Sequence, residues 1–135
     1  MILVDTNVLI DVLEDDPQWA QWSLGQLRAQ SKIHELAINA VVYAELSLAF
    51  ERLEQVEDTV TRLGLKLLDI PRAALFLAGK AFITYRKAGG IRSHVLPDFF
   101  IGAHAAVEKV AILTRDARRY ANYFPAVKLL IPPTS

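Results

Sequence analysis

The sequence contains no cysteine, so it can form neither disulfide bonds nor thiolate metal sites. It carries no net charge, because 15 acidic residues balance 15 basic ones, and its overall charge therefore indicates no particular partner. No apolar run approaches the roughly 18 to 20 residues that a membrane-spanning helix needs. The apolar opening at residues 1–4 is too short for a signal peptide and lacks a basic flank. We therefore expect a cytoplasmic protein that does not cross a membrane.

The composition is that of a globular protein. Hydrophobic residues make up 53% of the 135 residues and charged residues 22%, which suits one domain covering residues 1–135. Short apolar runs, typical of buried strands, alternate with longer segments of helical character. We expect strands at residues 1–4, 36–38, 65–70, 110–113 and 127–131. This alternation predicts an α/β fold in which helices cover both faces of a parallel sheet, as in a three-layer α/β/α domain.

Helical segments are expected between these strands. Pro17 suits the first turn of one helix, Asn39 can cap another, and Gly64 is placed to end a third. The predicted ranges are a short helix carrying residues 8–13, then 17–28, 40–50, 51–63, 71–87, 97–108 and 117–120.

Four separated acids lie where such a fold would gather them. Asp5 directly follows the first strand, and Asp116 comes shortly after the fourth. Glu45 lies two helical turns after the second strand, and Asp98 opens a helix after a loop. Ligands of open parallel sheets bind beyond the carboxyl ends of the strands, at a switch in strand order. We expect the four carboxylates to converge there.

Glu45 is the hardest of these acids to explain by itself. Its helical neighbours at three and four residues are Val41, Val42, Leu48 and Ala49, so it should project from a buried face. A buried carboxylate without a partner costs several kcal/mol or stays protonated. It needs a cation, a metal or a cage of hydrogen bonds.

Asp98 is in similar surroundings, because Ile101, Gly102 and Ala105 share its side of the helix. No lysine or arginine is obviously placed in the sequence to pair with both acids, so a shared divalent metal is the economical solution. An all-oxygen ligand set suits Mg²⁺ or Mn²⁺, whereas zinc usually brings histidine or cysteine. Carboxylate metal sites of this kind serve phosphodiester hydrolysis.

Taken singly, each acid has a simpler explanation. Asp5, Asp98 and Asp116 can each cap a helix, and Glu45 can be a hydrogen-bonded core carboxylate. The remaining acids considered have ordinary surface interpretations: Asp11, Asp15, Asp16, Glu51 and Asp69. We interpret His104 as a polar residue on a helix face.

The two tryptophans, Trp19 and Trp22, are interpreted as packing residues. A base-stacking role is the alternative.

Four segments resemble, in order, the motifs of PIN domains, especially the VapC-type toxins of bacterial toxin–antitoxin pairs. They are ILVDTNVLID at residues 2–11, NAVVYAEL at 39–46, LPDFFIGAHA at 96–105 and LTRD at 113–116. Together they span nearly the whole chain. The resemblance implies a parallel sheet of four or five strands, cleavage of RNA within the strand, a homodimer and inhibition by a cognate antitoxin protein.

Matched by position, the resemblance makes Asp5, Glu45, Asp98 and Asp116 the acidic residues that bind Mg²⁺ or Mn²⁺. Asp5 and Asp98 would ligate the metal most directly, and the other two would complete the cage. Asn7 and Thr114 match polar positions that support the metal or its water. Gly102 stands where many members have alanine, a departure that adds backbone freedom and removes no ligand.

A basic stretch at residues 85–90 resembles one that family members often carry before the third motif. Arg86, Lys87, Arg92 and Arg115 are therefore candidates for contacts with RNA phosphates.

Two other classes of function stay open. The first is a metal-dependent phosphatase or DNA nuclease, although aspartyl phosphatases usually carry a second Asp at the position of Asn7. The second is a non-enzyme, either a receiver-like domain or a catalytically inactive PIN-like RNA-binding domain. A receiver would need adjacent acids after the first strand, and an inactive scaffold typically lacks some of the four acids.

Overall fold

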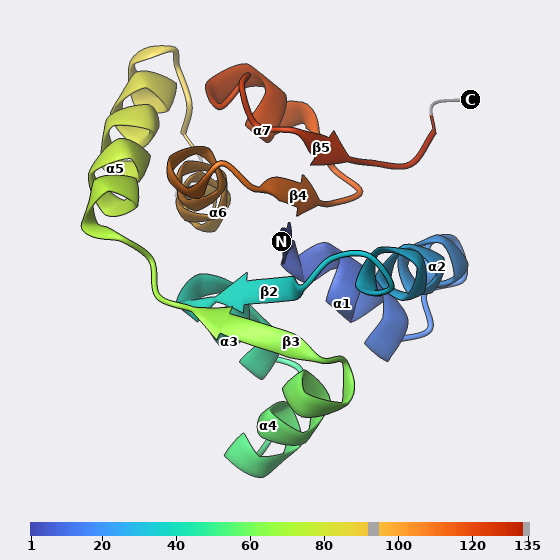
Figure 1. Cartoon of the computed structure of the whole chain (residues 1–135). Coiled ribbons are helices and arrows are strands. Elements are labelled where there is room, and N and C mark those ends of the chain that lie inside the picture. The colour runs from blue at the N-terminus through green and yellow to red at the C-terminus, as the bar shows by residue number, and fades with distance from the viewer. Residues whose placement is uncertain (92–94, 134–135) are drawn as a thin grey trace.

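The computed structural model of this chain describes residues 1–91 and 95–133. The candidate phosphate contact Arg92 therefore lies outside the described residues. Five strands form one sheet in which every neighbouring pair is parallel. They are β1 (Ile2–Val4), β2 (Leu36–Asn39), β3 (Leu65–Leu68), β4 (Ala111–Leu113) and β5 (Leu129–Leu130). The predicted parallel sheet of four or five strands flanked by helices is confirmed (Figure 1).

Seven helices connect the strands within the described residues. They are α1 (Thr6–Leu13), α2 (Ala20–Ser31), α3 (Ala40–Ser47), α4 (Leu53–Arg62), α5 (Arg72–Lys87), α6 (Leu96–Glu108) and α7 (Arg118–Tyr123). Asn39 caps α3 as expected, because its Oδ1 accepts hydrogen bonds from the backbone N–H groups of Val41 and Val42. Gly64 follows α4 with a φ of +66°, a backbone conformation that favours glycine.

The second helix begins later than the prediction of residue 17. Asp16 Oδ1 accepts hydrogen bonds at 2.9 Å from the N–H groups of Gln18 and Trp19, which holds a separate turn ahead of α2. A side chain that accepts from the N–H groups two and three residues later caps the start of a helical turn. Asp16 therefore has a capping role that its surface interpretation did not include.

The strand order is β3-β2-β1-β4-β5. From β1 the chain moves outward to β2 and β3, then crosses through α5 and α6 to β4 on the other side of β1. Figure 1 shows α5 and α6 side by side in this crossover. The order therefore reverses between β1 and β4, and ligands bind at such a reversal, beyond the carboxyl ends of the strands.

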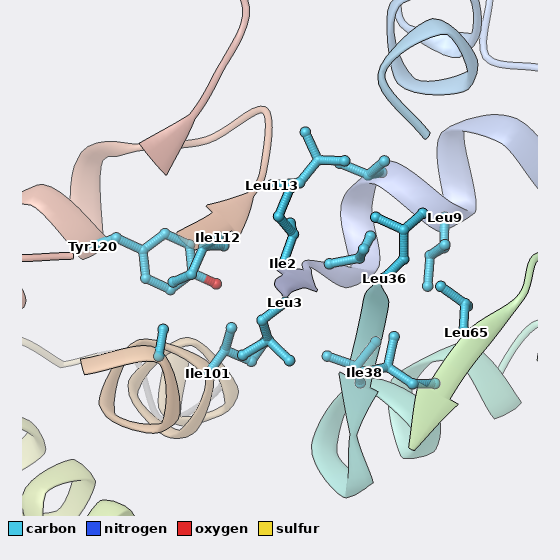
Figure 2. Packing of buried hydrophobic residues seen from close by; sticks show 14 of the residues in the cluster. Ile2, Leu3, Leu9, Leu36, Ile38, Leu65, Ile101, Ile112, Leu113 and Tyr120 are labelled. Carbon is cyan, nitrogen blue, oxygen red and sulfur yellow. The ribbon is translucent and has the colours of Figure 1, made fainter. Parts of the chain in front are cut away.

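The core lies on both sides of the central strands. Ile2, Leu3 and Val4 of β1 are essentially inaccessible to solvent, and Figure 2 shows Leu3 packed close to Ile38 and Ile101. Burying a large aliphatic side chain contributes about 1.5 to 3 kcal/mol. This packing fixes β1, and with it the residues that follow Val4.

Packing explains why position 102 is a glycine and not the alanine of many family members; the backbone freedom suggested from the sequence does not. Gly102 lies within α6, and a Cβ atom added there would overlap the ring of Phe124. Phe124 is 4% exposed, so its ring fills the space that an alanine methyl group would occupy.

Across the described residues, no helix combines the length and apolar character needed to span a bilayer.

Candidate active site

One cavity collects the four acids singled out in the sequence. It has a volume of about 140 Å³ and lies beyond the carboxyl ends of β1 and β4, where the strand order reverses. Its lining residues are Asp5, Thr6, Asn7, Glu45, Asp98, Asp116, Arg119 and Tyr120. Residues from opposite ends of the chain thus meet at the position that the topology predicts.

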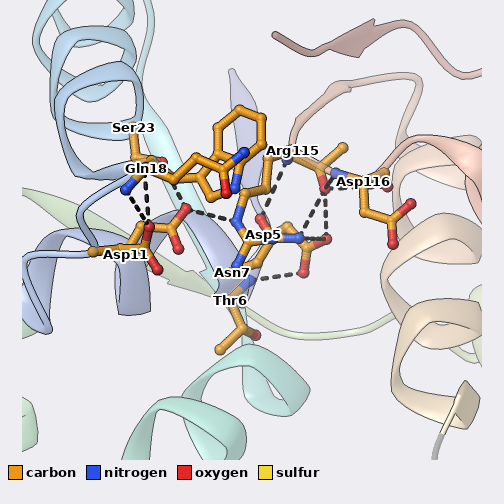
Figure 3. Close-up of polar contacts among 11 residues, drawn as sticks. Asp5, Thr6, Asn7, Asp11, Gln18, Ser23, Arg115 and Asp116 are labelled. Carbon is orange, nitrogen blue, oxygen red and sulfur yellow. Dashed lines mark hydrogen bonds and ion pairs between the residues drawn. The ribbon is translucent and has the colours of Figure 1, made fainter.

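Asp5 is held by hydrogen bonds on both carboxylate oxygens. Its Oδ1 accepts the N–H of Thr6 at 2.7 Å, which caps α1. Its Oδ2 accepts the hydroxyls of Thr114 and Tyr120, each at 2.9 Å. Asp5 therefore caps α1 and also lines the cavity, and its carboxylate has a fixed orientation (Figure 3).

Asn7 and Thr114 form a polar bridge between α1 and the segment after β4. The Asn7 amide nitrogen lies 3.2 Å from the Thr114 hydroxyl and 3.4 Å from Asp5 Oδ2. The Thr114 hydroxyl also accepts the backbone N–H of Asp116 at 3.1 Å. These contacts fix Asp5 relative to the backbone of Asp116.

The carboxylates repel one another in a poorly solvated space. Burial, and then the negative charge of Asp98, raise the pKa of Asp5 to about 6, although hydrogen bonds from Tyr120, Thr114 and Thr6 act in the opposite direction. Burial also raises the pKa of Glu45, and Asp98 adds to that rise. A bound cation would relieve both effects.

Glu45 is only partly buried, which corrects part of the sequence argument. Its Oε1 accepts the Thr6 hydroxyl at 2.8 Å. Leu48 is 88% exposed and Ala49 is exposed as well, because α3 ends at Ser47. Leu48 and Ala49 therefore do not bury Glu45.

Asp98 and Asp116 have arginine partners that the sequence analysis did not foresee. Arg119 lies 2.7 Å from Asp98 in an ion pair, so one of the two acids that the sequence analysis considered together, Asp98, has a basic partner. Arg118 lies 3.4 Å from Asp116 in a much more exposed ion pair. Partial burial acts to raise the pKa of Asp116, but the contacts of Arg118 and the charge of Arg119 lower it overall.

The ligand chemistry of the cavity fits a hard divalent cation. Four carboxylates supply only oxygen donors, as Mg²⁺ and Mn²⁺ prefer, and burial, followed by the charge of Asp98, raises the pKa of Asp5. In the side-chain positions described for residues 1–91 and 95–133, no three acids or histidines are grouped tightly enough to hold a metal ion. Binding would require the carboxylates that line the cavity to come closer together.

The candidate phosphate contacts lie in different places. Arg86 and Lys87 are exposed in the last turn of α5. They follow Tyr85, which lines a second pocket together with Arg119 and Asp116. Arg115 lies beside the acid cavity, but its Nε is 2.8 Å from the carboxylate of Asp11.

Asp11 is buried and not a surface acid, which corrects its sequence interpretation. It is 2% exposed, and it accepts the Ser23 hydroxyl at 3.0 Å and Arg115 Nε at 2.8 Å. Figure 3 shows this cluster next to Asp5, linked through Asn7, whose side-chain oxygen accepts the N–H of Arg115. The ion pair thus ties α1 to the segment that carries Asp116.

His104 is likewise a core residue and not a polar helix-face residue. It is 1% exposed, and its Nδ1 lies 3.1 Å from the side-chain nitrogen of Asn39. Burial lowers its pKa, a shift that Glu108 partly opposes. A neutral ring that accepts from Asn39 fits this environment, in which His104 links α6 to the start of α3.

Three residues of the cavity were missed from the sequence, namely Thr6, Arg119 and Tyr120. In the sequence Arg115, Arg118 and Arg119 cluster around Asp116, but such a cluster gives no direction for individual side chains. Tyr120 is 2% exposed, and its pKa is raised well above the usual value by burial and by the charge of Asp5. It therefore stays protonated and acts as a hydrogen-bond donor to Asp5.

The fold and the cavity define an α/β/α domain with an acidic site at the reversal of a parallel sheet. The sequence model of the PIN domain matches residues 2–124, and the chain belongs to the PIN domain family. No curated protein sequence matches it significantly.

Several solved structures are similar to this chain. VapBC2 from Rickettsia felis, bound to a DNA fragment from its promoter, has a TM-score of 0.75 at 21% identity and covers 98% of this chain and 100% of that one. VapBC-1 from nontypeable Haemophilus influenzae has a TM-score of 0.72 at 18% identity, with 97% and 98% covered. A toxin–antitoxin complex from Klebsiella pneumoniae has a TM-score of 0.66 at 22% identity, with 94% and 95% covered. These similarities establish a shared fold over nearly the full length.

Proposed function

We propose that this chain is a Mg²⁺- or Mn²⁺-dependent endoribonuclease and the toxin of a toxin–antitoxin pair. The observation that carries the proposal is the cavity that collects Asp5, Glu45, Asp98 and Asp116 where the strand order reverses. Burial and the proximity of Asp98 raise the pKa of Asp5, which is the electrostatic state that a divalent cation would relieve. Membership of the PIN family and the motif resemblance support nuclease chemistry on RNA.

In this proposal Asp5 and Asp98 hold the metal most directly, and Glu45 and Asp116 complete its surroundings. When bound there, a divalent metal would supply the activation of a water molecule and the stabilisation of negative charge that phosphodiester hydrolysis needs. Thr6, Thr114 and Tyr120 fix the Asp5 carboxylate through the hydrogen bonds at 2.7, 2.9 and 2.9 Å. That orientation exists before any ligand binds, so little reorganisation is needed at Asp5.

Arg119 has two roles in this proposal. In the structure it forms an ion pair with Asp98, and this pair would have to open for Asp98 to bind a metal. Its guanidinium then remains at the rim of the cavity, where a phosphate oxygen of the substrate can accept its hydrogen bonds.

The test compares single-stranded RNA, DNA of the same sequence and a small phosphate ester, each with Mg²⁺ or Mn²⁺ and with a chelator. We expect metal-dependent internal cleavage of RNA alone. Asp5→Asn and Asp98→Asn should each lower the rate by more than about a hundredfold, because each removes a proposed metal ligand. Asp58→Asn is the matched control, since Asp58 is exposed on α4.

Other outcomes would point to the alternatives. Cleavage of DNA or of the small ester in preference to RNA would replace the proposal with a DNA nuclease or a phosphatase. RNA binding without cleavage, together with no heat of Mn²⁺ binding in calorimetry, would indicate a catalytically inactive PIN-like RNA-binding domain.

We further propose that the chain acts in the cytoplasm, that it forms a homodimer and that a cognate antitoxin covers its surface. The structurally similar Klebsiella pneumoniae chain comes from a toxin–antitoxin complex. Large apolar side chains lie exposed around α3 and α4, including Leu48 at 88% and Leu53 at 64%, and such surfaces mark protein contacts. Light scattering of the purified chain, alone and after co-expression with a protein encoded by a neighbouring gene, tests both partners.

A further inference from the structure

A groove separate from the acid cavity borders it at Asp116. Its volume is about 440 Å³, and its lining includes Trp19, Arg115, Asp116, Arg118, Ile131 and Pro132. We call it the Trp19 groove. Because Asp116 lines both spaces, a ligand that fills one reaches the edge of the other. This volume falls within the range of roughly 300 to 1,000 Å³ that is typical of small-molecule binding pockets.

The groove contains a fixed pair of flat groups. The guanidinium carbon of Arg115 lies 5.7 Å from the ring centre of Trp19, in a cation–π contact. Arg115 is also held by Asp11, which is itself 2% exposed. The guanidinium plane is therefore ordered before any ligand arrives, so binding against it costs little conformational freedom.

The groove also offers an available positive charge. Asp11 compensates the charge of Arg115, but the side chain of Arg118 is 89% exposed and lies 3.4 Å from Asp116 in a solvent-screened contact. Such exposed pairs contribute little and exchange readily for another anion. Ile131 and Pro132 supply an apolar wall beside these charged groups.

We propose that the Trp19 groove binds one nucleotide of a single-stranded RNA, adjacent to the scissile phosphate. The base would stack against the contacting pair of Trp19 and Arg115, and a backbone phosphate would contact Arg118. Bases stack on aromatic rings and on guanidinium planes when they are not paired, so a single strand fits and a duplex does not. This inference rests on the proposed ribonuclease function and assigns part of its substrate selection to this groove.

An acidic peptide is the competing occupant. It would use Arg118 equally well, but it has no group that needs a flat aromatic and guanidinium pair. A nucleotide uses the ring, the charge and the shared wall with the acid cavity together, so the observations favour the nucleotide.

Fluorescence can test the groove directly, since the chain has two tryptophans. In the double variant Asp5→Asn, Trp22→Phe, only Trp19 emits and the proposed cleavage is blocked. We expect an RNA of about ten nucleotides, a length typical of single-strand sites, to quench this emission saturably. The matched variant Asp5→Asn, Trp19→Phe reports on Trp22, which does not line the groove although its ring packs 6.4 Å from that of Trp19, and its emission should be quenched much less.

Binding affinity provides the second measurement. Trp19→Leu in the Asp5→Asn background keeps an apolar side chain but removes the flat ring, and it should weaken RNA binding by about 5- to 100-fold. Trp22→Leu in the same background should weaken it less, because Trp22 packs against Trp19 but does not line the groove. Arg118→Gln should lower the salt dependence of log K by about 0.7, the value for one phosphate contact to a single strand. Arg62→Gln, a charge change on exposed α4, should leave that slope unchanged.

The possible failures are distinguishable. If wild-type protein cleaves RNA but neither Trp19 emission nor Trp19→Leu affinity responds, the groove assignment is wrong and the ribonuclease function stands. If inorganic polyphosphate quenches Trp19 as well as RNA does, binding is by charge alone and the stacking proposal is overturned. Quenching by an acidic peptide and not by RNA would assign the groove to a protein. If RNA quenches Trp19 but wild-type protein cleaves nothing, the nucleotide site stands and the proposed catalysis fails.

Discussion

The hydroxyl of Tyr120 donates a hydrogen bond to Asp5 at 2.9 Å across 115 positions of sequence. Both side chains are buried, at 2% and 5% exposure. The tyrosine stabilises the ionised form of Asp5, yet burial and Asp98 still raise the pKa of Asp5 to about 6. In the folded, metal-free protein, ionisation of Asp5 at neutral pH therefore lowers the free energy of unfolding.

The first prediction concerns the pH dependence of that stability. The folded-state pKa of Asp5, about 6, lies above the ordinary value of 3.8, so between these pH values the folded state binds more protons than the unfolded state. The free energy of unfolding without metal should fall as pH rises through this window, by about 3 kcal/mol for this group. Urea unfolding at pH values from 4 to 7.5 measures it.

Two variants provide the controls for this measurement. Asp5→Asn should flatten the dependence and stabilise the metal-free protein at pH 7.5. Tyr120→Phe removes a hydrogen bond that lowers the pKa of Asp5, so it should extend the fall to higher pH. A wild-type profile that is flat from pH 4 to 7.5, and identical to that of Asp5→Asn, would contradict the electrostatic picture of the cavity.

The second prediction is that Arg119→Gln tightens Mn²⁺ binding. The guanidinium lies 2.7 Å from Asp98, so it competes with the metal for that carboxylate, and a neutral side chain does not. Isothermal calorimetry at pH 7.5 should show a dissociation constant lowered by about tenfold, which corresponds to 1.4 kcal/mol. Arg118→Gln should have a smaller effect because its pair with Asp116 is more exposed. Weaker Mn²⁺ binding by Arg119→Gln would show that this arginine supports the metal site.

The third prediction concerns the ion pair between Asp11 and Arg115. Breaking a buried pair by removing one partner costs about 3 to 5 kcal/mol. The side chain of Arg115 is 32% exposed, so we expect about 2 kcal/mol for Asp11→Asn or Arg115→Gln in urea unfolding. The double variant should lose less than the sum of the two single losses. Strict additivity would mean that the contact contributes nothing of its own.

The fourth prediction is that Gly102→Ala destabilises the protein. Alanine in place of glycine inside a helix normally stabilises by about 0.5 to 1 kcal/mol. Here the added methyl group would overlap the ring of Phe124, so we expect a loss of about 1 to 3 kcal/mol from overpacking. In a Phe124→Leu background, which lacks the ring, the same substitution should be neutral or stabilising. An increase in melting temperature for the single variant would contradict this explanation.

The positions of the strands could be predicted from the sequence, because buried parallel strands consist of continuous apolar runs. The run at residues 1–4 became β1, and the residue that follows it, Asp5, became the centre of the acid cavity. Strands were expected at residues 65–70 and 110–113, and the segment between them forms the crossover that reverses the strand order.

The partners of buried polar side chains could not be predicted in the same way. Asp11 lies between Ile10 and Val12, and nothing in that local pattern indicates an arginine 104 positions away. His104 and Asn39 meet only because α6 packs against α3. The pair of Asp98 with Arg119 similarly depends on how α7 docks on α6. Such contacts follow from tertiary packing, which local spacing does not encode.

The parallel direction of the outer and central strands has a practical consequence for fusion proteins. β1 runs toward the acid cavity, so Met1 emerges at the opposite edge of the sheet. β5 runs the same way and ends at Leu130, after which Ile131 and Pro132 line the Trp19 groove. An affinity tag or fluorescent protein joined at the amino end would therefore project away from the proposed RNA site. Because Pro133, two residues before the carboxyl end, still lines the groove, we expect an addition at that end to interfere more with RNA binding.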